Sequence, residues 1–481
     1  MQDIIKNVLD SLKFKGTEYA SARVMGDESQ YISVKNGIVE ALEQSSSYGF
    51  GVMVLYKGSW GFASSYDLAP KNIERIAMKA LEVAKASSLV KKEKIVLSSL
   101  DKIVASYKTP YITDPFSVPV NEKLKVLLET DKLIKSVKGV SISFGHFRAY
   151  RKNILFMSTD GSIIDQEITE CGGGIEAMAI DGDEVQNRSY PNSHGGQMGT
   201  GGYEIFESLG LVGEAIRIGE EAVALLSAPQ CPAETTTLIL DPTQMALQVH
   251  ESCGHAVELD RALGMEASYA GTSFLTTDKL GKFKYGSEIV NIYGDATAPG
   301  GLGTFGYDDE GVPAQKFDII KEGMFVNYLT SRETASKIGQ KSNGTARASG
   351  WGRIPIVRMT NINLRPGDWK FQDLIRDTKD GIYMCTNREW SIDDKRLNFQ
   401  FGCEIAWEIK KGKLGRMLKN PTYQGITPEF WNSCDAICSK DYWQIWGVPN
   451  CGKGEPTQVA HVGHGTAPTR FRNVKIGVGK W

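Results

Sequence analysis

Residues 236–255 read TTLILDPTQMALQVHESCGH, an order that predicts a strand, a capped turn and then a helix. The first five residues are β-branched or aliphatic, as in a buried strand. Asp241 suits the N-cap of the following helix, with Pro242 in its first turn and Gln244 at the capping-box position. Apolar side chains then recur with helical spacing as far as Cys253. The predicted strand, cap and helix together fix the position of the last residues of the segment, at the end of the helix.

The segment ends with His250, Glu251 and His255, the residue types of a hydrolytic zinc site. Neutral imidazole binds Zn²⁺, catalytic sites keep three protein ligands plus a water, and a neighbouring Glu can accept the proton of that water. The histidines are five residues apart, and at about 100° per residue an undistorted α-helix would separate their rings by roughly 140°. The helix must therefore bulge or end between them, and Gly254 is the residue best able to allow this.

The alternative is that both histidines are polar or hydrogen-bonded core residues. The chain has only six histidines, and two of them flank the same glutamate. This clustering favours the metal interpretation.

Composition excludes several other classes of protein. With 481 residues, 41% hydrophobic and 23% charged, the chain is expected to be globular with two or three domains. A net charge of −2 gives no reason to expect nucleic acid or an anionic membrane as a partner. Residues 1–10 do not resemble a secretion signal and no apolar run could span a bilayer, so we expect a cytoplasmic protein with no membrane partner. Eight cysteines are too few for a disulfide scaffold, and an unusual cysteine is suspected of metal or catalytic duty.

The predicted fold class is α+β. An N-terminal α/β part contains two similar units, in which hairpins around Asn36-Gly37 and Asp160-Gly161 precede helices near 71–86 and 205–226. Duplication and chance similarity both explain this repetition. The C-terminal part, apart from the two-histidine helix and short helical patterns near 330 and 373, consists mostly of short antiparallel strands in a barrel or sandwich. The predicted domains are a first α/β unit (1–90), a connection (91–120), a second α/β unit (121–228) and the β-rich domain that carries the helix (229–481).

Two histidines leave a catalytic zinc site one protein ligand short. Cys451, in a segment with proline and glycine that we expect to be a turn, would be accessible and easily ionised by a metal. His464, in a glycine-rich tail, is the other leading candidate, and composition does not choose between them. The remaining candidates are Glu258, which needs the helix to continue, Cys434 and Cys438, in expected helical or loop residues, and His461, in the same tail.

Residues 301–306 read GLGTFG and match the glycine pattern of dinucleotide-binding loops. The pattern leads into Tyr307, Asp308, Asp309 and Glu310 rather than a helix, so a pyrophosphate would meet three carboxylates. A glycine-rich turn is therefore expected here. The carboxylates either help to shape an active-site cavity or belong to a structural turn.

Taken together, the motifs of this chain resemble those of the TldD family, the active zinc metallopeptidases of the TldD/PmbA group. The resemblance covers essentially the whole chain, and the combination of the HExxxH pattern with a remote Cys-Gly-Lys is specific. The matching segments are 250–255 (HESCGH), 307–313 (YDDEGVP), 358–361 (RMTN), 401–404 (FGCE), 451–453 (CGK) and 462–465 (VGHG).

This resemblance implies that His250, His255 and Cys451 are the zinc ligands and that Glu251 is the general base. It implies a metallopeptidase acting on short or unfolded peptides inside an enclosed dimer cavity, as a homodimer or as a heterodimer with an inactive PmbA/TldE-like subunit. The alternative is a zinc-stabilised scaffold or regulatory binding protein without peptidase activity. A closed structural site, however, prefers four protein ligands and has no need of Glu251.

Overall fold

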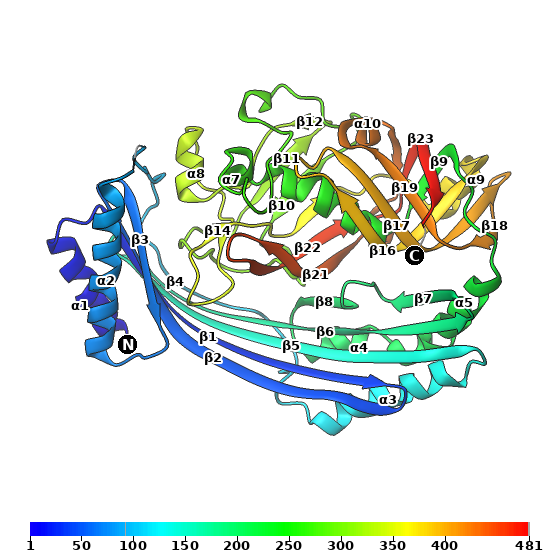
Figure 1. The fold of residues 1–481 in the computed structure, drawn as a ribbon, viewed down its shortest axis with the longest axis horizontal. Coiled ribbons are helices and arrows are strands. Elements are labelled where there is room, and N and C mark those ends of the chain that lie inside the picture. The colour runs from blue at the N-terminus through cyan, green and yellow to red at the C-terminus, as the bar shows by residue number, and fades with distance from the viewer. Residues whose placement is uncertain (92, 480–481) are drawn as a thin grey trace.

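The computed structural model describes residues 1–91 and 93–479. A long, curved N-terminal sheet carries helices at its ends and on its outer side, and the β-rich C-terminal part lies on the inside of the curve (Figure 1). This arrangement confirms the predicted α+β class. Within the described residues, no helix is long and apolar enough to cross a membrane.

Both predicted hairpins join one eight-stranded sheet, because β1 pairs with β2 on one side and with β5 on the other. Asn36 and Gly37 have φ angles of 50° and 80°, the left-handed backbone of a tight hairpin turn. The sheet order is β3-β2-β1-β5-β6-β4, with β7 and β8 also pairing with β6. The strands are β1 (Tyr19–Lys35), β2 (Ile38–Tyr56), β3 (Ser59–Ser65), β4 (Val104–Lys108), β5 (Val140–Ser158), β6 (Ile163–Asp181), β7 (Glu184–Tyr190) and β8 (Gln197–Thr200).

Amphipathic helices cover this sheet and bury their apolar faces against it. α1 and α2 pack on the first hairpin, and α3 and α5 pack on the second. The helix expected near 71–86 is confirmed, whereas the one expected near 205–226 is wrong as a single element. Gly210, with φ of 60°, separates it into two helices. The helices are α1 (Gln2–Phe14), α2 (Pro70–Ser88), α3 (Val120–Ser136), α4 (Tyr203–Ser208) and α5 (Leu211–Ser227).

The C-terminal part is built on a closed barrel. Each of β16, β9, β23, β19 and β17 pairs with the next, and β17 pairs back with β16. All of these pairs are antiparallel except β16 with β9. The predicted barrel is therefore present. The strands of this sheet are β9 (Glu234–Leu240), β16 (Asp380–Ile392), β17 (Asn398–Lys410), β18 (Lys413–Leu418), β19 (Pro421–Ile426), β20 (Cys434–Ile437) and β23 (Thr469–Val478).

Smaller elements pack around the barrel and include the short helices expected near 330 and 373, which are α8 and α9. Cys434 begins strand β20, so its expected place in a helix or loop is wrong; its strand pairs with β23, a partner far along the chain. The smaller elements are α7 (Leu259–Ala262), β10 (Ile292–Asp295), β11 (Lys316–Lys321), β12 (Met324–Phe325), α8 (Arg332–Lys337), β13 (Ala346–Arg347), β14 (Ile356–Val357), β15 (Ile362–Leu364), α9 (Phe371–Asp377), α10 (Thr427–Asn432), β21 (Gln444–Lys453) and β22 (Gln458–Thr466), with 3₁₀ turns at Thr277–Lys279 and Lys440–Tyr442.

Strand β9 leads directly into helix α6 (Pro242–Val249). The predicted cap is confirmed, because Asp241 Oδ1 accepts a hydrogen bond of 2.8 Å from the Thr243 amide. The predicted capping role of Gln244 is wrong. Its side chain is fully buried and its Nε2 donates to the Tyr423 hydroxyl at 2.9 Å, so it faces the barrel core instead of its own helix end.

Helix α6 continues into the predicted distortion, a π-helical turn at His250–Gly254, and then a 3₁₀ turn at His255–Val257. The His255 amide donates to the His250 carbonyl five residues back, which brings both imidazoles to one side of the helix. Gly254 has φ of −51°, a value open to any residue, but a Cβ there would lie 2.1 Å from Met359 Sδ. Close packing against the Met359 side chain, rather than backbone freedom, therefore favours glycine here.

We predict that Gly254→Ala lowers the free energy of unfolding by about 1–3 kcal/mol, the usual cost of overpacking a core. The added methyl group must displace either Met359 or the turn that carries His255. The matched control is Gly213→Ala in α5, where a Cβ meets nothing within 4 Å. This control should stabilise the chain by roughly 0.5–1 kcal/mol because alanine is the better helix former. Urea unfolding of both variants gives the comparison, and equal stabilities would contradict it.

Candidate metal centre

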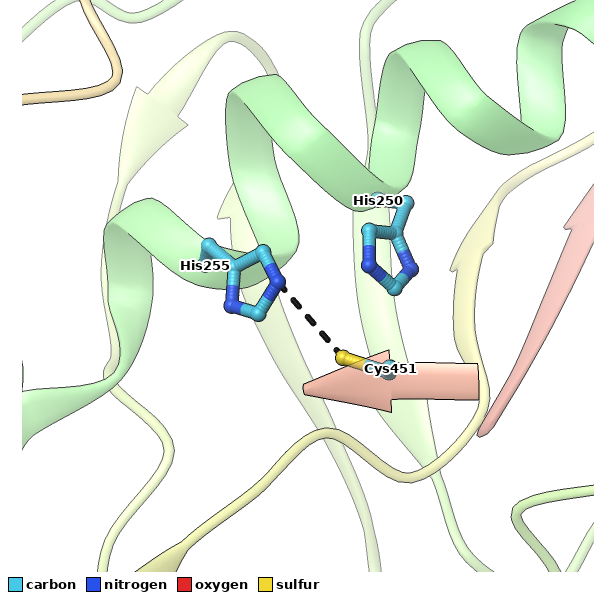
Figure 2. Close-up of side chains that lie close together, drawn as sticks. All are labelled: His250, His255 and Cys451. Carbon is cyan, nitrogen blue, oxygen red and sulfur yellow. Dashed lines mark hydrogen bonds between the residues drawn. The ribbon is translucent and has the colours of Figure 1, made fainter. Parts of the chain in front are cut away.

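Three side chains from two distant segments converge at the end of the distorted helix (Figure 2). His250 and His255 come from the π-helical region, and Cys451 comes from strand β21. One nitrogen of each histidine and the Cys451 sulfur all lie within 4.8 Å of one another. All three residues are buried. The sequence-predicted ligand set is thus assembled in one place.

Hydrogen bonds determine which nitrogen of His250 is free. His464 Nδ1 lies 3.1 Å from the Ile362 carbonyl and must donate to it, which leaves His464 Nε2 as an acceptor. His250 Nδ1, 2.8 Å from that Nε2, therefore carries a proton. Burial lowers the pKa of both imidazoles, so both rings are neutral. The lone pair of His250 is on Nε2.

The second histidine is oriented in the same way by a carboxylate. His255 Nδ1 lies 2.9 Å from Glu258 Oε2 and donates to it, which leaves Nε2 free. Burial holds the pKa of His255 well below its ordinary value. Lys453 Nζ lies 3.4 Å from the same carboxylate oxygen and offsets its charge. Glu258, considered as a possible ligand from sequence, is therefore a partner of a histidine instead.

Cys451 lies in strand β21, opposite Ala460 of β22, so its predicted place in a turn is wrong. Its sulfur is 3.5 Å from His255 Nε2 and accepts a hydrogen bond of 3.1 Å from Arg358. Burial alone would raise the pKa of the Cys451 thiol, yet the pKa lies below its ordinary value, and the permanent positive charge of the Arg358 guanidinium contributes to this lowering. A thiol in this state is ready to lose its proton to a metal.

Glu251 borders the three donors without being one of them. Its Oε1 lies 3.9 Å from His250 Nε2, the free nitrogen of that ring. Its other oxygen, Oε2, accepts a hydrogen bond from Arg396 Nη1. The glutamate is buried, with 5% of its surface exposed. The Glu251 carboxylate, a proton acceptor, is thus held beside the three donor atoms, with Oε1 near the free nitrogen of His250.

The other candidate ligands lie elsewhere. His461 lies in β22 and pairs with Glu170 through Nδ1 at 2.5 Å, and His464 lies behind His250 in the same strand rather than in an irregular tail. Cys434 and Cys438 are buried in the barrel core.

Asp308, the first of the three carboxylates after the glycine-rich segment, holds a structural turn. Asp308 accepts amide hydrogen bonds from Glu310, Val312 and Ala346. Asp309 pairs with Arg23 of the N-terminal sheet at 3.0 Å, and so ties the two parts together. Asp308 and Asp309 also line a cavity of about 530 Å³ between the parts, but His250, Glu251, His255 and Cys451 do not line it. The structural role is therefore present, and a share of these carboxylates in an active-site cavity stays a prediction.

Sequence reasoning missed several residues that orient the site. Arg358 and Lys453 stand in motifs that carried the family resemblance, which was a usable signal, although neither was given a role. Arg396 lies between β16 and β17, outside those motifs, and only the folded barrel brings it to Glu251.

The donor set suits Zn²⁺. Two neutral imidazoles with fixed tautomers and one thiol of lowered pKa match the nitrogen and sulfur ligands that zinc prefers. A three-residue set also leaves a fourth coordination position for water or substrate, as in catalytic rather than structural sites.

Comparison with known families agrees with this site. The PmbA/TldA metallopeptidase C-terminal domain matches residues 233–478, which include all three donors. Metallopeptidase domain 1 of the same family matches residues 20–84, and its central domain matches residues 113–228.

Individual relatives cover most of the chain. A metalloprotease from Methanocaldococcus jannaschii is 35% identical over 91% of this chain and 92% of its own length. A metalloprotease from Methanothermobacter thermautotrophicus is 32% identical over 96% and 95%, respectively. A relative from Saccharolobus solfataricus, named as a zinc metalloprotease TldD homolog, is 24% identical over 89% of this chain and 90% of its own.

Solved structures share the fold at low sequence identity. A Thermotoga maritima protein described as a candidate modulator of a DNA gyrase has a TM-score of 0.78 at 16% identity, over 99% of this chain and all of its own. TldE from Thermococcus kodakarensis has a TM-score of 0.74 at 17% identity, over 98% of this chain and all of its own. With the three matched domains and relatives above 30% identity, this chain belongs to the PmbA/TldD family and is a metallopeptidase.

Proposed function

We propose that this metallopeptidase is a zinc enzyme in which His250 Nε2, His255 Nε2 and Cys451 Sγ hold the metal and Glu251 is the general base. One observation carries the proposal: the three donor atoms lie within 4.8 Å of one another, with Glu251 Oε1 3.9 Å from one of them. A relative named as a zinc metalloprotease supports the choice of metal.

The chemistry then divides between the metal and the chain. Zinc at this position would lower the pKa of a bound water to about 7 and polarise a peptide carbonyl. Glu251 accepts the proton of the water that attacks the carbonyl, because its Oε1 faces the donors. His464 and Glu258 keep the two imidazoles in the tautomer whose Nε2 is free. Arg358 stabilises the thiolate of Cys451.

We infer that the substrates are short or unfolded peptides and that they are cleaved in an enclosed space. Two features support this. A cavity of about 530 Å³ lies between the N-terminal sheet and the C-terminal part, and Arg358, the partner of Cys451, lies on its wall. The chain also shares its fold with a TldE protein, which favours a dimer with a TldE-like subunit or with a second copy. Within such an assembly, a peptide could pair with an exposed strand edge, a mode that reads main chain more than side chain.

A zinc-stabilised scaffold is the weaker alternative. Among the described residues, the metal-binding cluster contains three ligands, whereas structural zinc sites prefer four. A scaffold would also have no use for a buried glutamate directed at the cluster.

We predict that Glu251→Gln retains about one zinc per chain and lowers kcat by roughly 10²–10⁴-fold, the usual contribution of a general base.

Cys451→Ser should instead lower zinc occupancy sharply, because a neutral hydroxyl does not replace a thiolate. Cys171→Ser, at a buried cysteine of the N-terminal sheet, is the matched control and should keep its zinc. Atomic absorption and a peptide-cleavage assay, with and without chelator, measure both properties. Loss of zinc in the Glu251 variant would make that residue a ligand and overturn these roles.

For His464, we predict that replacement by Ala weakens zinc affinity about 10–100-fold without removing a ligand, because His250 Nδ1 loses its acceptor. His464→Gln, which offers an amide oxygen in place of Nε2, should recover part of the loss. His461→Ala, at the histidine paired with Glu170, serves as the control and should leave zinc affinity unchanged. Competition with a chromophoric chelator gives the affinities. Complete and unrecoverable zinc loss in both His464 variants would indicate direct coordination.

The substrate inference predicts that one polypeptide is cut rapidly as a destabilised mutant and slowly in its native fold, because an enclosed site admits only extended chains. The fragments can be identified by mass spectrometry, and the assay run with the chain alone and with a co-expressed TldE-like subunit. Equal cleavage of the native and destabilised forms would contradict enclosure.

A further inference from the structure

The hairpin between β16 and β17 carries one charged side chain from the barrel to the candidate metal centre. Arg396 has a left-handed backbone, with φ of 64°, which is uncommon for a residue other than glycine. The conformation is held by neighbours: the Arg396 amide donates to the Asp393 carbonyl at 2.9 Å, and the Arg396 carbonyl accepts from Thr427 Oγ1 at 2.9 Å. Asp393 Oδ1 also accepts from the Leu397 amide at 2.8 Å. The backbone that carries this arginine is therefore fixed.

The tip of the hairpin also docks on the segment that follows the two histidines. The Phe274 amide donates to the Lys395 carbonyl at 2.9 Å. At Gly271, a Cβ would lie 2.6 Å from the Asp394 carbonyl oxygen, so the two backbones are in close contact. The barrel hairpin and the segment that follows the two histidines are thus in contact beside Arg396.

The guanidinium of Arg396 lies partly buried beside the base. Its Nη1 donates to Glu251 Oε2, and the side chain is 16% exposed against 7% for that of Glu251. Among the described residues, its Nε has no hydrogen-bond partner although it is buried.

This contact distinguishes the two oxygens of Glu251. Oε2 is held by Arg396, and Oε1 is left 3.9 Å from His250 Nε2. A carboxylate without such a partner can rotate about its terminal bond and present either oxygen or neither. A charge-assisted hydrogen bond from a fixed donor removes that freedom. General bases act only when they are held within hydrogen-bond reach of the proton that they take.

We propose that Arg396 is a positioning residue that holds the Glu251 carboxylate in the one orientation in which Oε1 serves as the base. The proposal rests on the proposed function, in which Glu251 is the base and not a ligand. Arg396 acts through Glu251, and its own contact with substrate is not required.

A purely structural ion pair is the competing explanation. Buried ion pairs are weak evidence for stability, since the cost of removing two charges from water offsets their attraction. A structural pair would change stability and metal content, whereas a positioning residue changes the rate at constant metal content. The two explanations therefore differ in measurable ways.

The first experiment compares Arg396→Gln and Arg396→Lys with the full-length wild-type protein. We expect zinc content and KM within about twofold of wild type, and kcat lowered at least tenfold by Gln and less by Lys, which keeps the charge but not the planar donor group. Arg416→Gln, at an arginine whose exposed side chain pairs with Glu408, is the matched control and should keep wild-type values. Unchanged kcat in Arg396→Gln, or zinc loss in both Arg396 variants, overturns the proposal.

A second experiment uses binding rather than turnover. A phosphinic peptide resembles the tetrahedral species formed during peptide hydrolysis, and calorimetry measures its affinity for each variant. Arg396→Gln should weaken binding about tenfold in the wild-type background and by less than about twofold when Glu251 is already Gln, since there is then no carboxylate to hold. Equal losses in the two backgrounds would show that Arg396 acts independently of Glu251 and would overturn the proposal.

Different results would contradict the proposed function and the proposed role of Arg396. If the wild-type chain neither binds zinc nor cleaves peptide, the proposed function is wrong. If the wild-type chain does both and Arg396→Gln matches it in kcat, the proposed function stands and only the role of Arg396 is lost.

Discussion

The hydrogen bond from the His255 amide to the His250 carbonyl is the constraint on which the metal centre depends. In a regular α-helix, residues five apart point in different directions, and no choice of side-chain rotamer would bring both Nε2 atoms to one ion. The single π-helical turn aligns them, and their ring centroids lie 4.8 Å apart. Met359 packs where a side chain on Gly254 would project, so a larger residue at this position would have to displace Met359 or the turn.

Around this turn, buried polar groups keep the ligands in the right chemical state. Each imidazole donates a hydrogen bond from Nδ1 to a fixed acceptor. The acceptor is His464 for His250 and Glu258 for His255. An uncompensated buried charge is expensive, and Glu258 is compensated by Lys453 at 3.4 Å and Arg261 at 3.6 Å. The cations therefore support a carboxylate that in turn supports a metal ligand. Loss of such a partner typically costs about 10–100-fold in metal affinity.

Much of this site could be predicted from sequence because its central part is local. The strand, the Asp241 cap and the need for a bulge between the histidines all follow from residues within one short segment. Cys451 could be chosen over His464 only by family resemblance, since the distance between segments far apart in the sequence is set by tertiary packing. For the same reason, the sequence predicts a turn at Cys451 where the structure has a strand. That strand forms by pairing with β22, and local sequence propensity does not reveal the pairing. Gln244 and Arg396 take their roles from contacts across the barrel, which no short-range pattern encodes.

The central claim is that two histidine nitrogens and one cysteine sulfur hold a zinc ion with a fourth position open. X-ray absorption at the zinc K-edge of the purified full-length protein tests it directly. The account predicts one sulfur at about 2.3 Å and nitrogen or oxygen neighbours at about 2.0–2.1 Å, two of them with the outer-shell signature of imidazole. A zinc environment without sulfur, or with two or more sulfurs, would contradict it.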